Sequence, residues 1–373
     1  MAALADAGRD ELAAYLALSQ IPGIGAARLR TIIAAFGSAG GALVAPHGAI
    51  AALPGFGPAA ATAIRAAGRR LGLEILREID RVGATTLIPG DPGYPALLAE
   101  IPDPPAVLFV WGDAALLARP AAAIVGSRNH TPYGAEAARL LAAGIAPAAV
   151  VISGMARGLD AIAHTAALDA AGGTVGVLGN GFGVVYPAAN RALYERVAAV
   201  GCLVTELPPG ERPRVSTFPR RNRIISGLAG VTVVVEAAVG SGALITADCA
   251  LDQGRSVLAV PGPITSPTST GCNKLIQQGA KPALSAADVL EELGITATHP
   301  VRDGSPAGTP RPHPVDLDDL QRSLWEALAT HSEHVDALVA GTGRGVGEVL
   351  TALTDLELRG LVAQQPGMIF ALA

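Results

Sequence analysis

The fold is decided at Val150-Val151-Ile152-Ser153-Gly154-Met155-Ala156-Arg157-Gly158-Leu159-Asp160, where an apolar run leads through a glycine-rich turn into a helical pattern. From about Arg81 onward this succession of strand, turn and helix repeats, which is typical of a parallel sheet with helices on both faces. We therefore predict an α/β protein with a Rossmann-like, doubly wound and mostly parallel sheet. An entry strand is expected at residues 107–110, and six more strands are expected at residues 122–125, 150–153, 174–178, 203–206, 231–236 and 256–260.

Glycine and small polar residues follow four of these strands. They form turns at residues 126–128, 154–158, 179–181 and 261–262. Ligands bind to open parallel sheets at the carboxyl ends of the strands, and glycine lets the backbone come close to a ligand. The sequence therefore predicts a site for phosphate groups at this edge of the sheet.

A basic segment lies between the fourth and fifth of the six strands. It reads Thr217-Phe218-Pro219-Arg220-Arg221-Asn222-Arg223-Ile224-Ile225-Ser226-Gly227-Leu228, with three arginines in four residues of a chain whose formal net charge is -5. Pro219 favours a helix start, so a helix is expected over about 220–228 with the arginines at its N-terminal end, where anions bind. Phe218 offers a stacking face. The alternative is a set of solvated arginines paired with Glu206 or Glu211.

Four titratable residues near this edge admit more than one interpretation. Asp160 and His164 are four residues apart, a spacing that can serve a metal, but no third ligand accompanies them, so we expect a local hydrogen-bonding pair. Glu206 and Glu236 end two strands and could do acid–base work. Because no nucleophile with a paired base accompanies them, we expect each glutamate to orient an arginine of the basic segment.

Several classes of protein are excluded by what the sequence lacks. No G-x-x-x-x-G-K-[ST] motif is present and no G-x-G-x-x-G opens the first crossover, so neither ATP hydrolysis nor a dinucleotide cofactor is expected. The cysteines at positions 202, 249 and 272 lack the spacing of a zinc site or a disulfide framework. The charged N-terminus and the lack of an apolar run of about 18 residues argue against a signal peptide and a membrane span. We expect a cytoplasmic protein without metal or cofactor.

Residues 1–78 are expected to form a helical domain in which one pattern occurs twice. Apolar-Pro-Gly-apolar-Gly precedes a helix at Ile21-Pro22-Gly23-Ile24-Gly25 and again at Leu53-Pro54-Gly55-Phe56-Gly57. The pattern resembles the helix-hairpin-helix motif, in which the glycines admit a DNA phosphate and the next helix presents its N–H groups. The alternative is a helical bundle that binds nothing, because few basic residues lie close by.

The C-terminal part is expected to be a separate domain at 315–373, joined by a flexible linker at 296–314 that is rich in Pro, Gly, Thr and Asp. Three helices and a β-hairpin predict a winged helix. Because Glu348, Asp355 and Glu357 lie on its third helix, we expect it to contact protein or to regulate rather than to bind DNA. The expected helices are at residues 316–330, 335–339 and 347–359, and the expected strands are at 361–363 and 368–370.

Over residues 124–280 the sequence closely resembles the DNA-processing protein A family, also called DprA or Smf. The motifs that carry the resemblance are Val125-Gly126-Ser127-Arg128, the segment 153–160 with His164, Tyr186-Pro187 with Asn190, the segment 218–228, the segment 240–247, and Gly254-Arg255 with Val260-Pro261-Gly262. So many motifs in one order are highly specific. The departures are small: Cys272 and Ala229 stand where hydroxyl residues are common in the family.

The resemblance implies a non-enzymatic protein whose Rossmann-like core, residues 79–295, binds single-stranded DNA in a positive pocket. It also implies a homodimer that delivers the strand to RecA in natural transformation or recombination. The surface for self-association is expected at Leu275, Ile276 and the helix 285–293. The candidate residues for binding single-stranded DNA are Gly126, Ser127, Arg128, Gly154, Arg157, Gly158, Phe218, Arg220, Arg221, Asn222, Arg223 and Lys274.

Two other functions stay open at this point. One is a nucleotide-hydrolysing Rossmann enzyme that resembles the phosphoribohydrolases, which carry P-G-G-x-G-T-x-x-E. The comparable place here reads Val239-Gly240-Ser241-Gly242-Ala243-Leu244-Ile245-Thr246 and lacks a glutamate at that spacing. The other is a scaffold whose two terminal domains bind proteins.

Overall fold

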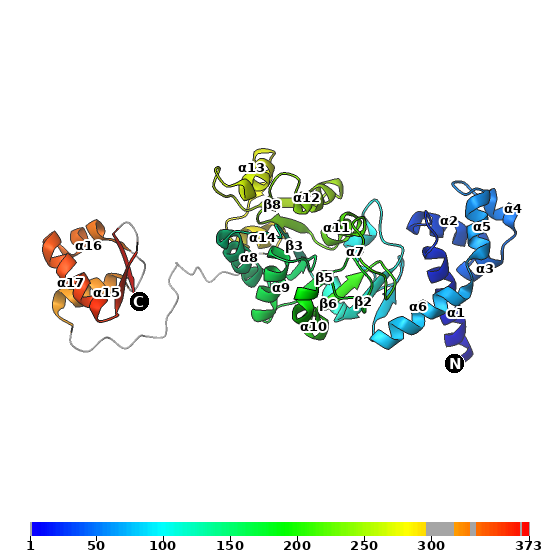
Figure 1. The fold of residues 1–373 in the computed structure, drawn as a ribbon, viewed down its shortest axis with the longest axis horizontal. Helices are drawn as coiled ribbons and strands as arrows, with labels where there is room; N and C mark the ends of the chain where they lie inside the picture. Colours follow the sequence, from blue (N-terminus) through cyan, green and yellow to red (C-terminus); the bar gives the residue numbers. More distant parts are fainter. Residues whose placement is uncertain (1, 296–316, 329–332, 366–367, 373) are drawn as a thin grey trace. The chain divides into compact units, whose positions relative to one another are not determined.

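Two compact units make up the chain, Met1–Ala297 and Thr298–Ala373 (Figure 1). This computed structural model describes residues 2–295, 317–328, 333–365 and 368–372. The expected linker at residues 296–314 lies outside the described residues.

A nine-stranded sheet forms the centre of the first unit, in the order β1-β2-β6-β5-β4-β3-β7-β8-β9. The strands from β6 to β9 in this order run parallel, and β2 and β1 add an antiparallel edge. The predicted fold class, the entry strand and all six core strands are confirmed. The bounds are β1 Thr85–Leu87, β2 Leu108–Gly112, β3 Ala121–Val125, β4 Val150–Ser153, β5 Thr174–Val177, β6 Cys202–Thr205, β7 Val231–Val234, β8 Ser256–Ala259 and β9 Lys281–Pro282.

Helices cover both faces of the sheet because its strands are apolar on both sides. In β3, Ala122 and Ile124 pack with α8, α9 and α14, whereas Ala123 and Val125 pack with α7, α11, α12 and α13. Figure 1 shows α8 to α10 on one side and α11 to α13 on the other. The bounds are α7 Ala96–Ala99, α8 Pro132–Ile145, α9 Leu159–Asp169, α10 Arg191–Val200, α11 Thr217–Gly227, α12 Gly242–Asp252, α13 Thr270–Gln277 and α14 Ala286–Glu292.

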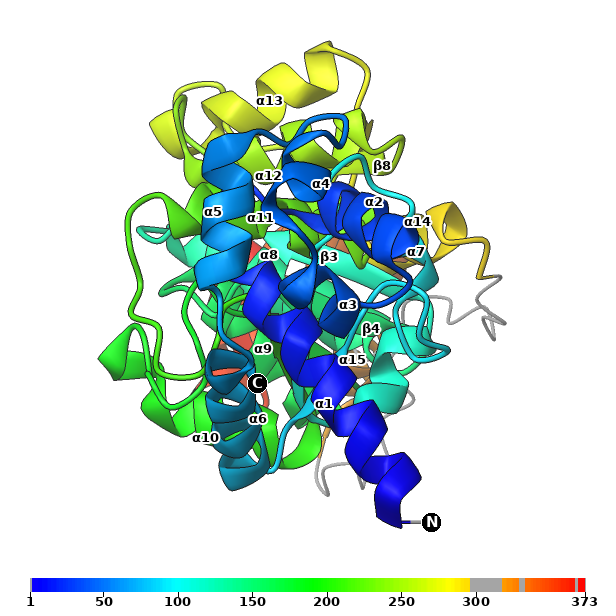
Figure 2. The same ribbon diagram turned by 90° about the vertical axis from the view of Figure 1, so that its right-hand side faces the viewer.

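Six helices form the N-terminal part of the first unit (Figure 2). Gly72 of α6 lies against Ala13 of α1, where a Cβ would stand 1.8 Å from the Ala13 carbonyl oxygen. Only glycine therefore allows this close helix packing. The Tyr15 hydroxyl donates to the Ala106 carbonyl at 3.0 Å and ties the helices to the sheet domain. The bounds are α1 Ala2–Ser19, α2 Ala26–Phe36, α3 Ala39–Val44, α4 His47–Ala51, α5 Pro58–Ala66 and α6 Arg69–Val82.

Both predicted glycine hairpins are present at helix starts, before α2 and before α5. Arg28 joins them, because its Nη1 donates to Gly23 O at 3.0 Å while its guanidinium lies 5.8 Å from the centre of the Phe56 ring. The two turns therefore pack side by side.

The second unit has the three helices and the β-hairpin expected of a winged helix. A short strand, β10, joins the hairpin in a sheet of order β10-β12-β11, an addition that the sequence did not predict. Across the described ranges, no helix of either unit is long and apolar enough to cross a bilayer. The bounds are α15 Asp319–Leu328, β10 Glu333–His334, α16 Val335–Thr342, α17 Val346–Leu358, β11 Val362–Gln365 and β12 Ile369–Leu372.

Candidate functional site

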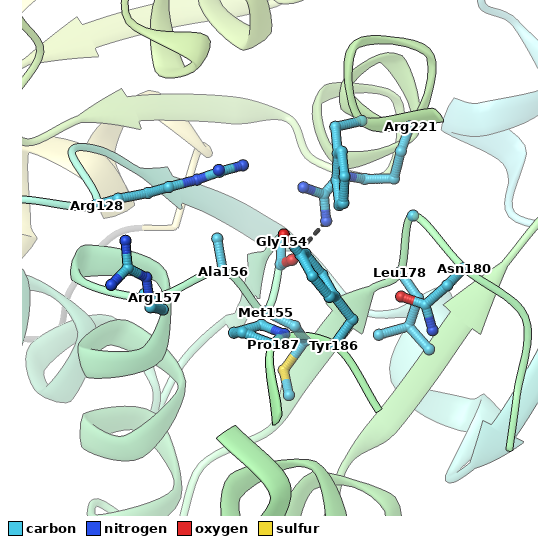
Figure 3. Close-up of a pocket in the computed structure, with 12 residues that line it drawn as sticks. Arg128, Gly154, Met155, Ala156, Arg157, Leu178, Asn180, Tyr186, Pro187 and Arg221 are labelled. Carbon is cyan, nitrogen blue, oxygen red and sulfur yellow. Dashed lines mark hydrogen bonds between the residues drawn. The ribbon is translucent and has the colours of Figure 1, made fainter. Parts of the chain in front are cut away.

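A cavity of about 530 Å³ opens at the carboxyl edge of the sheet, where the strand order reverses. The chain runs from β3 through β4, β5 and β6 in one direction, and then returns to the other side of β3 as β7. Such a reversal is the usual place for a ligand in an open parallel sheet. The walls come from the turns after β3 and β4 and from the N-terminal ends of α11 and α12. A smaller recess adjoins the cavity (Figure 3).

The glycines of the two turns serve close packing between loops. A Cβ on Gly126 would stand 2.4 Å from Leu159 Cδ1, and one on Gly158 would stand 2.5 Å from Ser127 O. Gly158 also has φ +82°, which favours glycine. The Leu159 amide donates to Ser127 O at 3.2 Å. The two loops therefore form one connected surface.

Arg221 is buried in the wall of this site, only 5% exposed. Its Nη1 donates to Gly154 O at 2.5 Å and also to Val177 O; Figure 3 shows the guanidinium directed at Gly154. Burial lowers the pKa of Arg221 to about 10, and the charge of Asp160 opposes that shift. Arg221 thus holds backbone and supplies a buried positive charge. Its neighbour Asn222 donates to Gly242 O at 3.2 Å and so holds the start of α12.

Arg220 and Arg223 point to the other side of α11, away from the cavity. Arg223 Nη2 lies 2.7 Å from Glu206 Oε2, and Arg220 Nε lies 3.2 Å from Glu206 Oε1. Arg223 also pairs with Asp103 at 3.1 Å. The prediction that Glu206 orients an arginine of the basic segment is confirmed. Helix α11 begins at Thr217, earlier than predicted. The three arginines do not act as one cluster, because helical spacing of about 100° per residue sends Arg221 to a different side from Arg220 and Arg223.

Glu236 does not orient an arginine, so the prediction for this residue was wrong. Its carboxylate accepts from Thr131 N at 2.9 Å, Thr131 Oγ1 at 2.7 Å and Thr268 Oγ1 at 3.1 Å. The loop after β3 passes the end of β7, so the partners of Glu236 are hydroxyl and amide donors and not an arginine. Glu236 is thus a loop anchor, 2% exposed.

Asp160 and His164 lie on α9 but have separate partners, so the predicted local pair was wrong. Asp160 Oδ2 accepts from Gly154 N at 3.2 Å and from Ala156 N at 3.3 Å. His164 Nδ1 lies 2.7 Å from Thr174 Oγ1. Burial raises the pKa of Asp160, and burial with the Arg221 charge lowers the pKa of His164 to about 3. Among the described residues, no group of three His, Cys, Asp or Glu side chains could hold a metal.

Two of the candidate arginines remain open to a ligand. Arg128 and Arg157 are exposed, line the site and have no carboxylate partner within the part of the chain that the structure describes. Figure 3 shows them on neighbouring loops at one end of the recess. A guanidinium that is not already paired can offer a planar fork to a phosphate. Of the five candidate arginines, these two therefore offer accessible charge at the site itself.

An aromatic pair borders the same site. The rings of Tyr186 and Phe218 lie 5.4 Å apart at an interplanar angle of 38°, and the Arg128 guanidinium lies 5.7 Å from the centre of the Phe218 ring. Tyr186 was missed as a candidate residue, although Tyr186-Pro187 stood among the motifs, because the sequence does not show that its loop folds over the recess. Lys274 is exposed on α13, outside both cavities.

Comparison with known proteins identifies the family. The family model described as DNA recombination-mediator protein A matches residues 85–294, and the DprA winged helix domain matches residues 308–368. The chain belongs to the DprA family. The predicted resemblance is therefore confirmed.

Relatives of known name cover most of the chain. Protein Smf of Synechocystis sp. is 33% identical, over 96% of this chain and 98% of that protein. Protein Smf of Escherichia coli is 42% identical, over 75% of this chain and 76% of that protein. Like these relatives, this DprA chain belongs to a family of DNA-processing proteins.

Two solved DprA structures share the fold. DNA processing protein A of Streptococcus pneumoniae is 38% identical, with a TM-score of 0.56 over 63% of this chain and 85% of that one. DNA processing protein A of Helicobacter pylori, described for its single-stranded DNA binding mode, is 28% identical, with a TM-score of 0.52 over 56% of this chain and 95% of that one.

Proposed function

We propose that this DprA chain binds single-stranded DNA at the carboxyl edge of its sheet, without catalysing a reaction. The observation that carries the proposal is that two accessible arginines, Arg128 and Arg157, line the same recess as the aromatic rings of Tyr186 and Phe218. Sites for single strands combine a positive groove for phosphates with aromatic faces for bases. The solved relative from Helicobacter pylori, which is described for binding single-stranded DNA, supports the same choice.

The arrangement favours binding over nucleotide hydrolysis. Both glutamates at the sheet edge have partners: Glu206 pairs with arginines and Glu236 accepts from two threonines. Asp160 accepts two backbone amides. A general base must reach the proton that it abstracts, and these carboxylates are already engaged by the loops and helices around them.

As a recombination mediator, the protein would protect incoming strands and load RecA on them, working as a homodimer in the cytoplasm. The family description as a recombination mediator supports this part of the proposal. Leu275 does not contribute to the dimer surface, because it is buried in the core between α13 and the sheet. Ile276 and α14 remain the candidate surface. Displacement of a single-strand binding protein and growth of RecA filaments, measured with and without this chain, test the loading.

Strand binding is tested by fluorescence anisotropy of a labelled oligothymidine over a salt series, with duplex DNA and ATP as competitors. We expect the affinity for the labelled strand to fall as the salt concentration rises. Duplex DNA and ATP should compete poorly with that strand. In the double variant Arg128→Ala/Arg157→Ala, the slope of log K against log salt should become shallower by about 0.7 for each phosphate contact that is lost.

A matched control separates local from overall charge. Arg139→Ala/Arg196→Ala removes the same charge from exposed arginines that pair with Glu136 and Asp169 on helices away from the cavity. This control should bind as the wild type does. Equal losses in both double variants, or no binding by the wild type, would exclude the proposed site.

A further inference from the structure

Two buried carboxylates lie beneath the two loops that carry the accessible arginines. Asp160 is 6% exposed and Glu236 is 2% exposed. Each accepts hydrogen bonds from the backbone of one loop: Asp160 from the loop 154–158, and Glu236 from the loop 126–131. Among the described residues neither carboxylate makes a direct ion pair, although the buried Arg221 charge acts on Asp160, so their direct contacts are the hydrogen bonds to the loops.

Asp160 fixes the backbone immediately before Arg157. It accepts the amides of Gly154 and Ala156, which flank Met155. Met155 has φ +57°, a left-handed conformation that residues with a side chain rarely adopt. From the other side, Asn190 Nδ2 donates to Met155 O at 3.0 Å and to Ala156 O at 3.1 Å. The backbone that leads to Arg157 is therefore held through both its N–H groups and its carbonyls.

Glu236 fixes the loop around Arg128 at two points. Its backbone carbonyl accepts from Ser127 N at 2.8 Å, and its carboxylate accepts from the amide and the hydroxyl of Thr131. Gly134 leaves room for this contact, since a Cβ there would stand 2.2 Å from Glu236 Oε2. Arg128 thus lies on a short loop whose two ends are bound by one residue.

We propose that Asp160 and Glu236 are positioning residues, one for each arginine: Asp160 fixes Arg157, and Glu236 fixes Arg128. The inference rests on the strand-binding function proposed above. A phosphate contact must stop the motion of an arginine side chain and of the loop beneath it, and a loop that is already fixed loses less freedom on binding. Carboxylates suit this task because they only accept hydrogen bonds, whereas an amide would turn an N–H group toward donors.

Double-mutant cycles on oligothymidine affinity test the assignment. Asp160→Asn and Glu236→Gln are combined with Arg157→Ala and with Arg128→Ala. We expect each carboxamide variant to weaken binding about three- to ten-fold, in the lower part of the range of coupling between neighbouring residues. The loss from Asp160→Asn should disappear in the Arg157→Ala background and persist in the Arg128→Ala background, and Glu236→Gln should behave in the opposite way.

A purely structural role would make all four combinations additive, and that result overturns the inference. If the wild type binds the strand and the cycles are additive, the proposed function stands and only the roles of Asp160 and Glu236 are wrong. If the wild type does not bind, the proposed function and the roles of both arginines are wrong as well. The two failures are therefore distinguishable.

Amide hydrogen exchange provides a readout that does not depend on DNA. Asp160→Asn should speed exchange in residues 154–158, and Glu236→Gln should speed exchange in residues 127–131, each leaving the other loop less affected. Unchanged exchange in both loops overturns the inference. If Asp160→Asn does not fold, Asn190→Ala takes its place, because Asn190 holds the same loop from the opposite side, and it should show the same coupling to Arg157.

Discussion

The guanidinium of Arg221 occupies the space that a side chain at Gly154 would need. A Cβ on Gly154 would stand 2.6 Å from both Nη1 and Nη2 of Arg221. The same guanidinium donates to the Gly154 carbonyl, while the Gly154 amide donates to Asp160. One peptide segment thus lies between a buried cation and a buried anion, and the glycine makes that arrangement possible.

Gly154→Ala should therefore destabilise the protein and weaken strand binding together. The added methyl group displaces Arg221, and overpacking of this kind costs about 1–3 kcal/mol. Gly242→Ala is the matched control for stability, since a Cβ there meets nothing within 4 Å. Urea denaturation measures both variants. Equal free energies of unfolding would mean that Arg221 moves aside without cost.

Arg221→Met should cost much more stability than Arg220→Met. Loss of Arg221 leaves the Asp160 charge without its buried counter-charge and two carbonyls without a donor, at a cost of about 3 kcal/mol. Arg220 is 62% exposed, and such pairs contribute less than about 1 kcal/mol. Thermal and urea unfolding of both variants check the order. A reversed order would contradict the division of the basic segment described above.

Phe218→Leu should weaken oligothymidine binding at least five-fold, because stacking of one base contributes about 1–3 kcal/mol. Gly179 lies beneath the ring, where a Cβ would stand 2.9 Å from Phe218 Cδ1, so the ring has a fixed support. Tyr186→Phe keeps an aromatic face and should bind almost as the wild type does. The loss should be similar for oligothymidine and oligoadenosine. A loss confined to one of them would indicate readout of base edges instead of stacking.

His164 should make the fold sensitive to acid. Its pKa falls from 6.5 when unfolded to about 3 when buried in the folded state, so the unfolded state binds the proton first. Neutral His164 stabilises the folded state above pH 6.5, and this stabilisation is lost as pH falls toward 3. Over that window the equilibrium constant for unfolding should rise by up to ten-fold per pH unit.

The control for that effect is the His164→Gln variant, whose unfolding should depend less on pH between 6 and 4, about the window set by the two pKa values. Burial of Asp160 acts in the opposite direction, since its raised pKa favours the folded state as pH falls. The difference between wild type and variant isolates His164, and equal slopes would show that this histidine is protonated without unfolding.

The sequence predicted the sheet and its ligand edge because apolar strands followed by glycine turns encode both locally. It predicted the basic segment but not its division. Helical spacing separates Arg221 from Arg220 and Arg223, but which side faces the cavity depends on how α11 packs, through contacts such as the Thr217 hydroxyl on Gly179 O at 2.7 Å. Glu236 was misassigned for a related reason: its partner Thr131 lies 105 residues away in sequence. Pairings of this length are set by tertiary packing, which a single sequence does not display.

The two arginine loops follow neighbouring strands, and the chain between them crosses to the opposite edge of the sheet through α8 and the turn before β4. In that turn, Pro147 and Ala148 are exposed, as sites that accept insertions usually are. A fluorescent label or a short epitope inserted between them would belong to the same domain as both loops and would lie outside the cavity. The fold thus provides a place for a label that leaves the cavity free.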